Sequence, residues 1–254
     1  MSVFSTSCLS GGLYLVTGAS SGIGRTVAVR ISEYGGRVVV SGRDETRLRA
    51  VHAALAGSGH VLSRMVLDNG DGAAEWVKNL AQEHGPLNGI FHAAGIELVR
   101  PVRLTKDADV QKLFGAALYP AMGIARAVAQ KGIVHDAASI VFMSSVASHC
   151  GQAGMSAYCA SKAAVDGLVR ALSCEFAARK IRVNSIVAGA VVTEMHHRLT
   201  QTMGQEALAK YEEQHLLGFG SQDDVADAAI FLLSSASKWI TGSSMAVDGG
   251  YMVR

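Results

Sequence analysis

Short runs of apolar and β-branched residues alternate with longer segments of helical periodicity along the whole chain. The runs are nearly continuous in apolar residues, as strands covered on both faces require. Because strands that alternate with helices form right-handed crossovers, the pattern predicts an α/β fold: a doubly wound, seven-stranded parallel sheet with helices on both faces. The expected strands are Leu13–Thr17, Arg37–Ser41, Val61–Val66, Gly89–His92, Ser139–Met143, Arg182–Val187 and Ser244–Val247, and the expected helices lie near 22–35, 44–56, 72–84, 105–130, 156–178, 199–216 and 222–235.

The pattern continues without a break along the chain. No linker, low-complexity segment or internal repeat interrupts it, and the 254 residues contain only three prolines. At ~150 residues per domain this length fits one or two domains, and the unbroken pattern favours a single domain over residues 1–254. In a doubly wound sheet, ligands bind beyond the carboxyl ends of the strands.

Charge and composition exclude several classes of partner. The net charge is +2, from 23 Lys and Arg against 21 Asp and Glu, and the basic residues form no cluster. This argues against a nucleic-acid partner. Charged residues make up 17% of the chain, against ~25% in average domains, which is typical of doubly covered strands or apolar subunit contacts.

The sequence also argues against a membrane span and against secretion. The longest uncharged run, 137–161, holds too many Ser, His and Gln residues to lie in lipid. No basic residue precedes Arg25 to form the start of a secretory signal. The four cysteines lack CxxC spacing, which favours reduced thiols. We therefore expect a cytoplasmic protein with no membrane partner.

A glycine-rich segment, Thr17–Gly24 (TGASSGIG), joins the first expected strand to the first expected helix. Gly18 permits a tight turn, Gly22 lets the backbone approach a pyrophosphate, and Gly24 lets the helix pack close to the strand. The positive end of the helix then binds phosphate. A glycine-rich turn can be purely structural, but its place at a strand–helix junction favours a phosphate-binding loop.

This TGxxxGIG loop resembles that of the classical short-chain dehydrogenase/reductase family. Further landmarks follow in the order and spacing of that family through nearly the whole chain: Asp68, Ala94-Gly95, Ser145, Tyr158-x-x-x-Lys162, Asn184, Gly189-x-x-x-Thr193 and Asp248-Gly249-Gly250. The resemblance implies a Rossmann fold, a nicotinamide coenzyme and a small-molecule substrate. It implies coenzyme contacts from Gly18, Ser20, Ser21, Gly22, Ile23, Gly24, Arg43, Asp68, Ala94, Gly95, Tyr158, Lys162, Gly189, Val191 and Thr193.

Ser145, Tyr158 and Lys162 are the expected catalytic residues. Tyr158 and Lys162 are four residues apart and share one face of the expected helix. A phenol has a pKa of ~10. A neighbouring ammonium, together with the positive charge of an oxidised nicotinamide, is expected to lower that pKa toward a useful range. Ser145 follows the fifth strand and can hold the substrate oxygen beside Tyr158. A YxxxK spacing alone would fit any amphipathic helix without a catalytic role. The upstream Ser145, at the spacing found in the family, argues against that alternative.

The end of the second expected strand bears on the choice of coenzyme. An acidic residue there would bind the adenosine ribose and repel a 2′-phosphate. This chain has Gly42 followed by Arg43, whose guanidinium can pair with phosphate, which predicts NADP(H) over NAD(H). Against this, Ser21 supplies no second cation, and Arg43 could simply begin the next helix. Asp68 could bind the adenine amino group, cap a helix, or do both.

Two departures from the family concern the reacting centre. The usual Asn-Asn-Ala-Gly is His92-Ala93-Ala94-Gly95, and the position of a usual catalytic Asn is Ala117. The missing Asn puts the proton relay from the lysine in doubt, so we expect slower chemistry. His92 is expected to satisfy backbone groups of the sheet and not to catalyse.

Substrate is expected to meet the loops after strands four, five and six. Candidate lining residues are Glu97, Val146, His149, Gln152, Met155 and Met195, with residues of a lid segment at 194–219. His196 and His197 are adjacent and point apart on a helix, so no metal site is expected. Together with Arg198, they could meet an anionic substrate or simply face solvent.

The resemblance implies an NADP(H)-dependent oxidoreductase that interconverts a carbonyl and a secondary alcohol, such as a 3-oxoacyl reductase-like ketoreductase. It also implies a homotetramer or homodimer through the helices at 105–130 and 156–178. The alternative is a regulatory or structural subunit that binds a dinucleotide but has little turnover, as Ala117 suggests.

Overall fold

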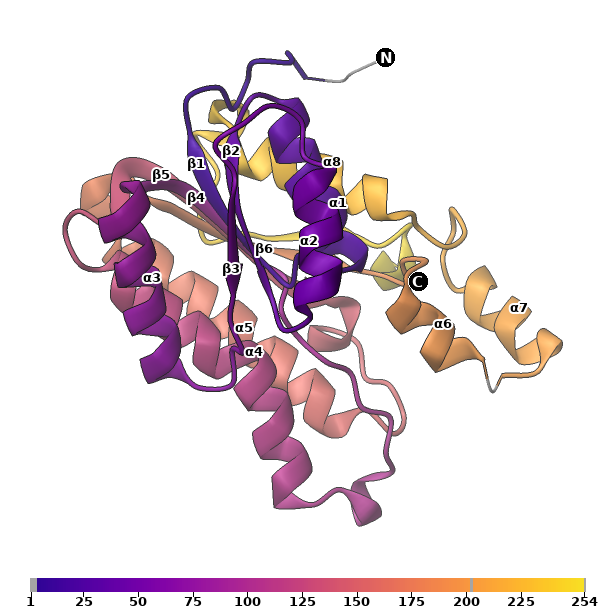
Figure 1. Cartoon of the computed structure of the whole chain (residues 1–254). Coiled ribbons are helices and arrows are strands. Elements are labelled where there is room, and N and C mark those ends of the chain that lie inside the picture. Colours follow the sequence, from indigo (N-terminus) through magenta and orange to yellow (C-terminus); the bar gives the residue numbers. More distant parts are fainter. Residues whose placement is uncertain (1–3, 202, 254) are drawn as a thin grey trace.

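Seven parallel strands form one sheet in the part of the chain that the computed structural model describes, residues 4–201 and 203–253 (Figure 1). The strand order is β3-β2-β1-β4-β5-β6-β7, and every neighbouring pair is parallel. The predicted doubly wound parallel sheet is confirmed, and its order reverses between β1 and β4. The strands are β1 Leu13–Thr17, β2 Arg37–Gly42, β3 Val61–Arg64, β4 Leu87–His92, β5 Val134–Ser145, β6 Arg182–Ala188 and β7 Ser244–Val247.

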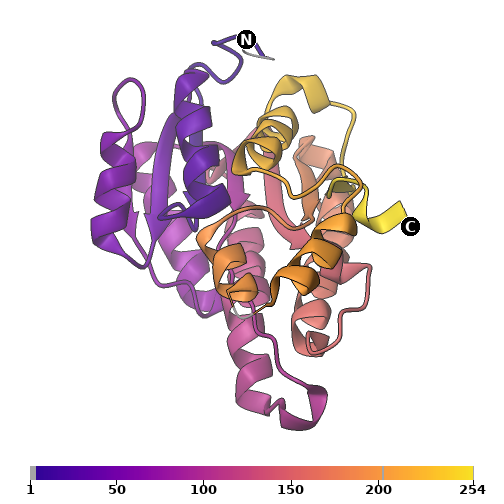
Figure 2. The ribbon, with the colours of Figure 1, turned by 90° about the vertical axis from the view of Figure 1, so that its right-hand side faces the viewer.

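Helices cover both faces of the sheet. Helices α1 and α8 pack together on one face, and α3, α4 and α5 pack side by side on the other (Figure 1). Helices α6 and α7 lie beside one another, outside these layers (Figure 2). The helices are α1 Gly22–Glu33, α2 Glu45–Ala53, α3 Gly70–His84, α4 Asp107–Val128, α5 Ser156–Glu175, α6 Glu194–Thr200, α7 Gln205–Glu213 and α8 Gln222–Leu233.

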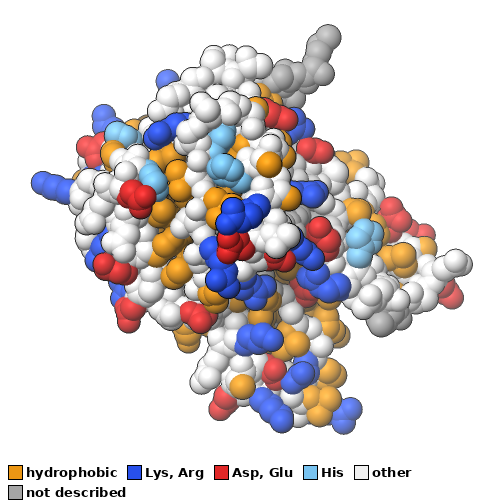
Figure 3. Space-filling model, viewed as in Figure 1, with side chains coloured by type: hydrophobic (Ala, Val, Ile, Leu, Met, Phe, Trp, Pro, Cys, Tyr) orange, Lys and Arg blue, Asp and Glu red, His pale blue; other side chains and the backbone are white. Residues whose placement is uncertain are grey.

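Charged side chains of both signs occupy the face of the molecule drawn in Figure 3. Lys and Arg gather in the middle of this face, over β3 and α2 (Figure 3). None of the helices in the described residues is both long enough and apolar enough to cross a membrane.

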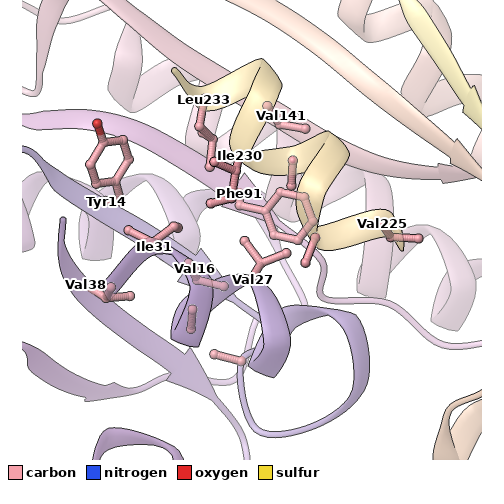
Figure 4. Packing of buried hydrophobic residues seen from close by; sticks show 14 of the residues in the cluster. Tyr14, Val16, Val27, Ile31, Val38, Phe91, Val141, Val225, Ile230 and Leu233 are labelled. Atoms are coloured by element: carbon pink, nitrogen blue, oxygen red, sulfur yellow. The ribbon is translucent and has the colours of Figure 1, made fainter. Parts of the chain in front are cut away.

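The core on the α1 and α8 face fixes where these helices sit on the sheet. Val16 of β1 and Phe91 of β4 pack against Val27 and Ile31 of α1 and Ile230 of α8, and all five are fully buried (Figure 4). Burying such a side chain contributes about 1.5–3 kcal/mol. The packing therefore holds the start of α1 at the end of β1, where the glycine-rich turn lies.

One predicted element is wrong. The expected helix near 199–216 is two helices, α6 and α7, and α6 begins already at Glu194. The Thr193 side chain caps α6 by accepting a hydrogen bond of 3.1 Å from the backbone N–H of His196, and α7 starts afresh after Gly204. The apolar spacing alone did not show this break.

Candidate active site

A cavity of about 900 Å³ lies at the carboxyl ends of β1, β4, β5 and β6, where the strand order reverses. The loops that follow these strands line it from the side of the sheet, and α6 and α7 line it from the opposite side. Most of the predicted site residues meet here, although they come from distant parts of the sequence. They are Gly18, Ser20, Ser21, Gly22, Ile23, Gly24, Arg43, Ala94, Gly95, Glu97, Ser145, Val146, Gln152, Met155, Tyr158, Lys162, Gly189, Val191, Thr193 and Met195.

The glycine-rich turn forms one end of the cavity. Gly18 has a φ of 67°, and a Cβ atom there would lie 2.8 Å from the backbone nitrogen of Ala94. A Cβ atom on Gly24 would collide with the carbonyl oxygen of Gly18. Ser21, the N-cap of α1, makes no side-chain capping bond in the described structure, which leaves the first amides of the helix to a ligand. The turn therefore fits a pyrophosphate.

Ser145, Tyr158 and Lys162 meet on the wall of the same cavity. Ser145 ends β5, and the other two lie one turn apart on α5. The Lys162 Nζ donates a hydrogen bond of 3.0 Å to the Met143 carbonyl oxygen and lies 5.8 Å from the centroid of the Tyr158 ring. This arrangement places a hydroxyl, a phenol and an ammonium around one point of the cavity.

Lys162 alone does not produce the expected lowering of the Tyr158 pKa. Burial raises the pKa of Tyr158 to about 12, although a hydrogen bond with Ser145 opposes the shift and the Glu97 carboxylate adds to it. Burial also lowers the pKa of Lys162 to about 8. At neutral pH the Tyr158 phenol is therefore protonated and uncharged, while Lys162 is still mainly protonated and positively charged.

Asp166, one turn beyond Lys162, is a buried residue that the sequence did not single out. Its carboxylate accepts hydrogen bonds from Ser144 Oγ of β5 (2.9 Å) and from Ser185 Oγ of β6 (2.7 Å). The same carboxylate raises the pKa of Lys162, against the effect of burial. Asp166 therefore fixes α5 to two strands and favours the charged form of the lysine. The sequence signal for this role is the spacing of four residues between Lys162 and Asp166, which places both on one face of α5.

His92 and Ala117, the two departures from the family pattern, touch one another. The Nδ1 of His92 lies 2.7 Å from Thr17 Oγ1, and its Nε2 lies 3.4 Å from the carbonyl oxygen of Ala117 on α4. Burial, with a further contribution from the charge of Lys162, lowers the pKa of His92 to about 4, although the hydrogen bond with the Ala117 carbonyl opposes the shift. The imidazole is therefore neutral and joins β1, β4 and α4 at the position without an Asn side chain.

Two predicted site residues lie elsewhere. Asp68 is not among the lining residues, and its carboxylate accepts a bond of 2.7 Å from Asn69 Nδ2. Its alternative role as a helix cap is wrong, since Asn69 caps α3 by accepting from the Gly72 N–H. His149 also lies outside the lining, with Nδ1 2.7 Å from Ser148 Oγ. His149 turns toward buried Asp166, because Nδ1 is also 3.8 Å from that carboxylate.

A second cation stands beside Arg43. Arg64, at the end of β3, donates from its Nε to the Arg43 carbonyl oxygen over 3.2 Å. Parallel pairing brings the two together, because Gly42 of β2 lies opposite Arg64. Ser21, where a second cation would be expected, supplies none. Arg64 could not be predicted, since only the strand register shows that residues 43 and 64 are neighbours.

Side chains from both sides form the substrate end of the cavity. Glu97, after β4, has an Oε1 3.8 Å from Nη2 of Arg198 on α6. His196 of α6 packs its ring against Phe219 and Tyr211, with centroids 4.7 and 6.4 Å apart. Among the described residues, no group of three or more His, Cys, Asp or Glu side chains is arranged to hold a metal ion.

Comparisons with known proteins agree with this architecture. Residues 18–252 match the family model described as "Enoyl-(Acyl carrier protein) reductase". The chain is 31% identical over 245 residues to 3-oxoacyl-[acyl-carrier-protein] reductase FabG of Rickettsia prowazekii (strain Madrid E), covering 96% of this chain and 98% of that relative. It is 29% identical over 249 residues to gluconate 5-dehydrogenase of Gluconobacter oxydans (strain 621H), covering 96% of each.

A solved structure from Beutenbergia cavernae, assigned as an NAD(P)-dependent gluconate 5-dehydrogenase with NADP bound at low occupancy, has the same fold. Its TM-score is 0.86 at 29% identity, covering 97% of this chain and 98% of that one. Fold and relatives define the class of the protein as a doubly wound α/β oxidoreductase. More particularly, the chain belongs to the short-chain dehydrogenase/reductase family, and the predicted resemblance is confirmed.

Proposed function

We propose that the protein is an NADP(H)-dependent ketoreductase, which interconverts a carbonyl compound and a secondary alcohol. The observation that carries the proposal is the meeting of Ser145, Tyr158 and Lys162 on the wall of a cavity whose other end is the glycine-rich turn. The names of the relatives, a 3-oxoacyl reductase and a gluconate 5-dehydrogenase, support an oxidoreductase of this kind.

Backbone groups at the glycine-rich turn would hold the coenzyme pyrophosphate, and Lys162 would hold the ribose next to the reacting ring. When bound, the coenzyme supplies a hydride to the carbonyl carbon, or accepts one from the alcohol carbon. Gly189, Val191 and Thr193 line the cavity after β6 and would contact the coenzyme on that side. Asp68 remains a proposed adenine contact.

NADP(H) is favoured over NAD(H) by the charges at the end of β2. Position 42 is a glycine and not an acidic residue. The exposed Arg43 and Arg64 both lie there, with the Arg64 guanidinium 3.2 Å from the Arg43 carbonyl oxygen. Guanidinium groups pair well with phosphate, and basic side chains gather over β3 (Figure 3). The NADP in the solved relative supports the same preference.

Tyr158 would act as the acid in the reducing direction. With a pKa raised to about 12, its phenol is protonated at neutral pH and can donate its Oη proton to the carbonyl oxygen. Ser145 would hold that oxygen, and Lys162 would stabilise the phenolate left behind. In the oxidising direction Tyr158 must first lose its proton, so an alkaline pH should favour alcohol oxidation.

We further propose that residues 1–254 act as one coenzyme-binding domain, with the segment 194–219 as its lid. The protein would work in the cytoplasm as a homotetramer or homodimer, on small-molecule carbonyl compounds and without nucleic-acid or membrane partners. Weakly charged stretches of α4 and α5, predicted as subunit contacts, support the oligomer.

The rival function is a subunit that binds a dinucleotide and has little turnover, and Ala117 is the observation that favours it. Oxidation of NADPH, followed by its absorbance with a panel of oxoacyl thioesters, keto sugars and cyclic ketones, separates the two. We expect turnover on part of the panel. Tight NADPH binding with no turnover on any carbonyl would establish the rival instead.

A further inference from the structure

Two side chains that line the substrate end of the cavity have buried polar atoms without partners. The Oε2 atom of Glu97 and both ring nitrogens of His196 are buried, and none has a hydrogen-bond partner among the described residues. The two residues come from separate segments that both line the cavity, Glu97 from the loop after β4 and His196 from α6. Because buried polar groups are normally paired, two such residues lining one cavity indicate a ligand that pairs them.

Glu97 is placed close to the reacting phenol. Its side chain is only 12% exposed, and its carboxylate is one of the charges that raise the pKa of Tyr158. The contact of 3.8 Å between Oε1 and Arg198 is too long for a hydrogen bond and leaves Oε2 without a donor. A carboxylate in this place accepts hydrogen bonds and repels anions.

The ring of His196 is held in place by packing against aromatic rings, and not by hydrogen bonds to its nitrogens. His196 as a whole is 8% exposed, and its ring meets Phe219 edge to face and Tyr211 nearly parallel. Burial and the neighbouring His197 and His215 lower its pKa, while Glu212 opposes the shift, so the imidazole is neutral at physiological pH. A neutral imidazole offers one donor and one acceptor, which matches a hydroxyl group.

We propose that Glu97 and His196 form a hydroxyl-binding subsite beside Tyr158, and that the substrate is a neutral ketone with hydroxyl groups on the carbons next to the carbonyl. The proposal rests on the proposed ketoreductase function. An alkyl chain in this place would leave both groups buried and unpaired, whereas a hydroxyl donates to Glu97 Oε2 and pairs with His196. The subsite therefore selects polyol-like or sugar-like ketones against acyl chains.

Matched ketones test the subsite. With NADPH, we expect kcat/KM for α-hydroxycyclohexanone to exceed that for α-methylcyclohexanone about 10- to 100-fold, because the methyl isostere leaves the buried polar atoms unpaired. Glu97→Leu should bring this ratio close to one, and Glu97→Gln should keep part of it. His196→Phe retains the aromatic packing, removes both nitrogens, and should lower the ratio several-fold.

The outcomes separate this proposal from the proposed function. Turnover of both ketones with equal efficiency, or a preference for the methyl compound, would leave the ketoreductase in place and overturn the subsite. If Arg198→Ala removes the ratio as fully as Glu97→Leu, Glu97 acts through its ion pair with the lid, and the subsite is also wrong. Absence of NADPH oxidation with either ketone and with the whole panel would overturn both proposals.

Discussion

The two ends of the cavity are built from different parts of the polypeptide. At the coenzyme end, backbone atoms of a turn crowd together so closely that Gly18 and Gly24 have no room for a Cβ atom. At the substrate end, side chains such as Glu97 and His196 meet from distant segments and leave polar atoms unpaired. The first end is suited to a ligand common to many proteins, and the second to one particular substrate.

The difference shows where substitutions should act. Changes at the coenzyme end should alter binding of the dinucleotide whatever the ketone, since they disturb backbone geometry. Changes at the substrate end should alter the choice between ketones. Tyr158 lies between the two ends, and its loss should stop chemistry without disturbing either.

Tyr158→Phe should have the largest effect. It removes the proton donor and should lower kcat about 1,000-fold, while the affinity for NADPH, measured by fluorescence titration, changes less than threefold (roughly 0.6 kcal/mol). Retention of more than a tenth of the activity would remove Tyr158 from the mechanism.

Gly24→Ala should weaken NADPH binding about 100-fold, or about 2.7 kcal/mol, because the new Cβ collides with the Gly18 carbonyl oxygen. Gly151→Ala is the matched control, since Gly151 lies in the loop after β5 and nothing lies within 4 Å of a Cβ there. Circular dichroism checks that both variants fold. Equal affinities in the two folded variants would show that the close approach at Gly24 has no part in coenzyme binding.

His92→Ala should destabilise the protein by about 2–4 kcal/mol, because it opens a buried space and breaks the links to Thr17 and Ala117. Urea unfolding measures the effect. His135→Ala, at an exposed position of β5, should change the free energy of unfolding by less than about 0.5 kcal/mol. If both variants are equally stable, His92 does not support the sheet as we infer.

Arg43→Ala should lower the ratio of kcat/KM for NADPH to that for NADH about tenfold (about 1.4 kcal/mol), with Arg64→Ala adding a smaller decrease. Arg49→Ala is the control, because the exposed Arg49 pairs with Glu45 on α2. An unchanged ratio in the Arg43 and Arg64 double variant would contradict the preference for NADP(H).

The smallest expected effect is the change in the rate of ketone reduction with pH. Lys162 loses its proton as the pH rises through its lowered pKa of about 8, so ketone reduction should be roughly halved near that pH. Tyr158 keeps its proton throughout this range. Lys162→Arg keeps its charge and should move the decline to higher pH. If the activity of the Lys162→Arg variant declines at the same pH as that of the unaltered protein, the decline is due to the titration of another group.

The sequence alone predicted the sheet from its apolar runs and the glycine-rich turn from its glycines at a strand–helix junction. Ser145, Tyr158 and Lys162 were singled out by their order and spacing along the chain, which resemble those of the family. The sequence did not place Arg64 beside Arg43, or the break between α6 and α7. Nor did it show that burial would raise the pKa of Tyr158, because burial depends on what packs around a residue.

Only the tertiary structure brought Glu97 and His196 into one cavity, linked His92 to Ala117, and turned His149 away from the substrate end toward Asp166. In each case the contact joins segments far apart in the chain, and no local spacing records it. A short motif can encode a backbone turn for a shared coenzyme, whereas the folding of the whole chain decides which side chains face the substrate.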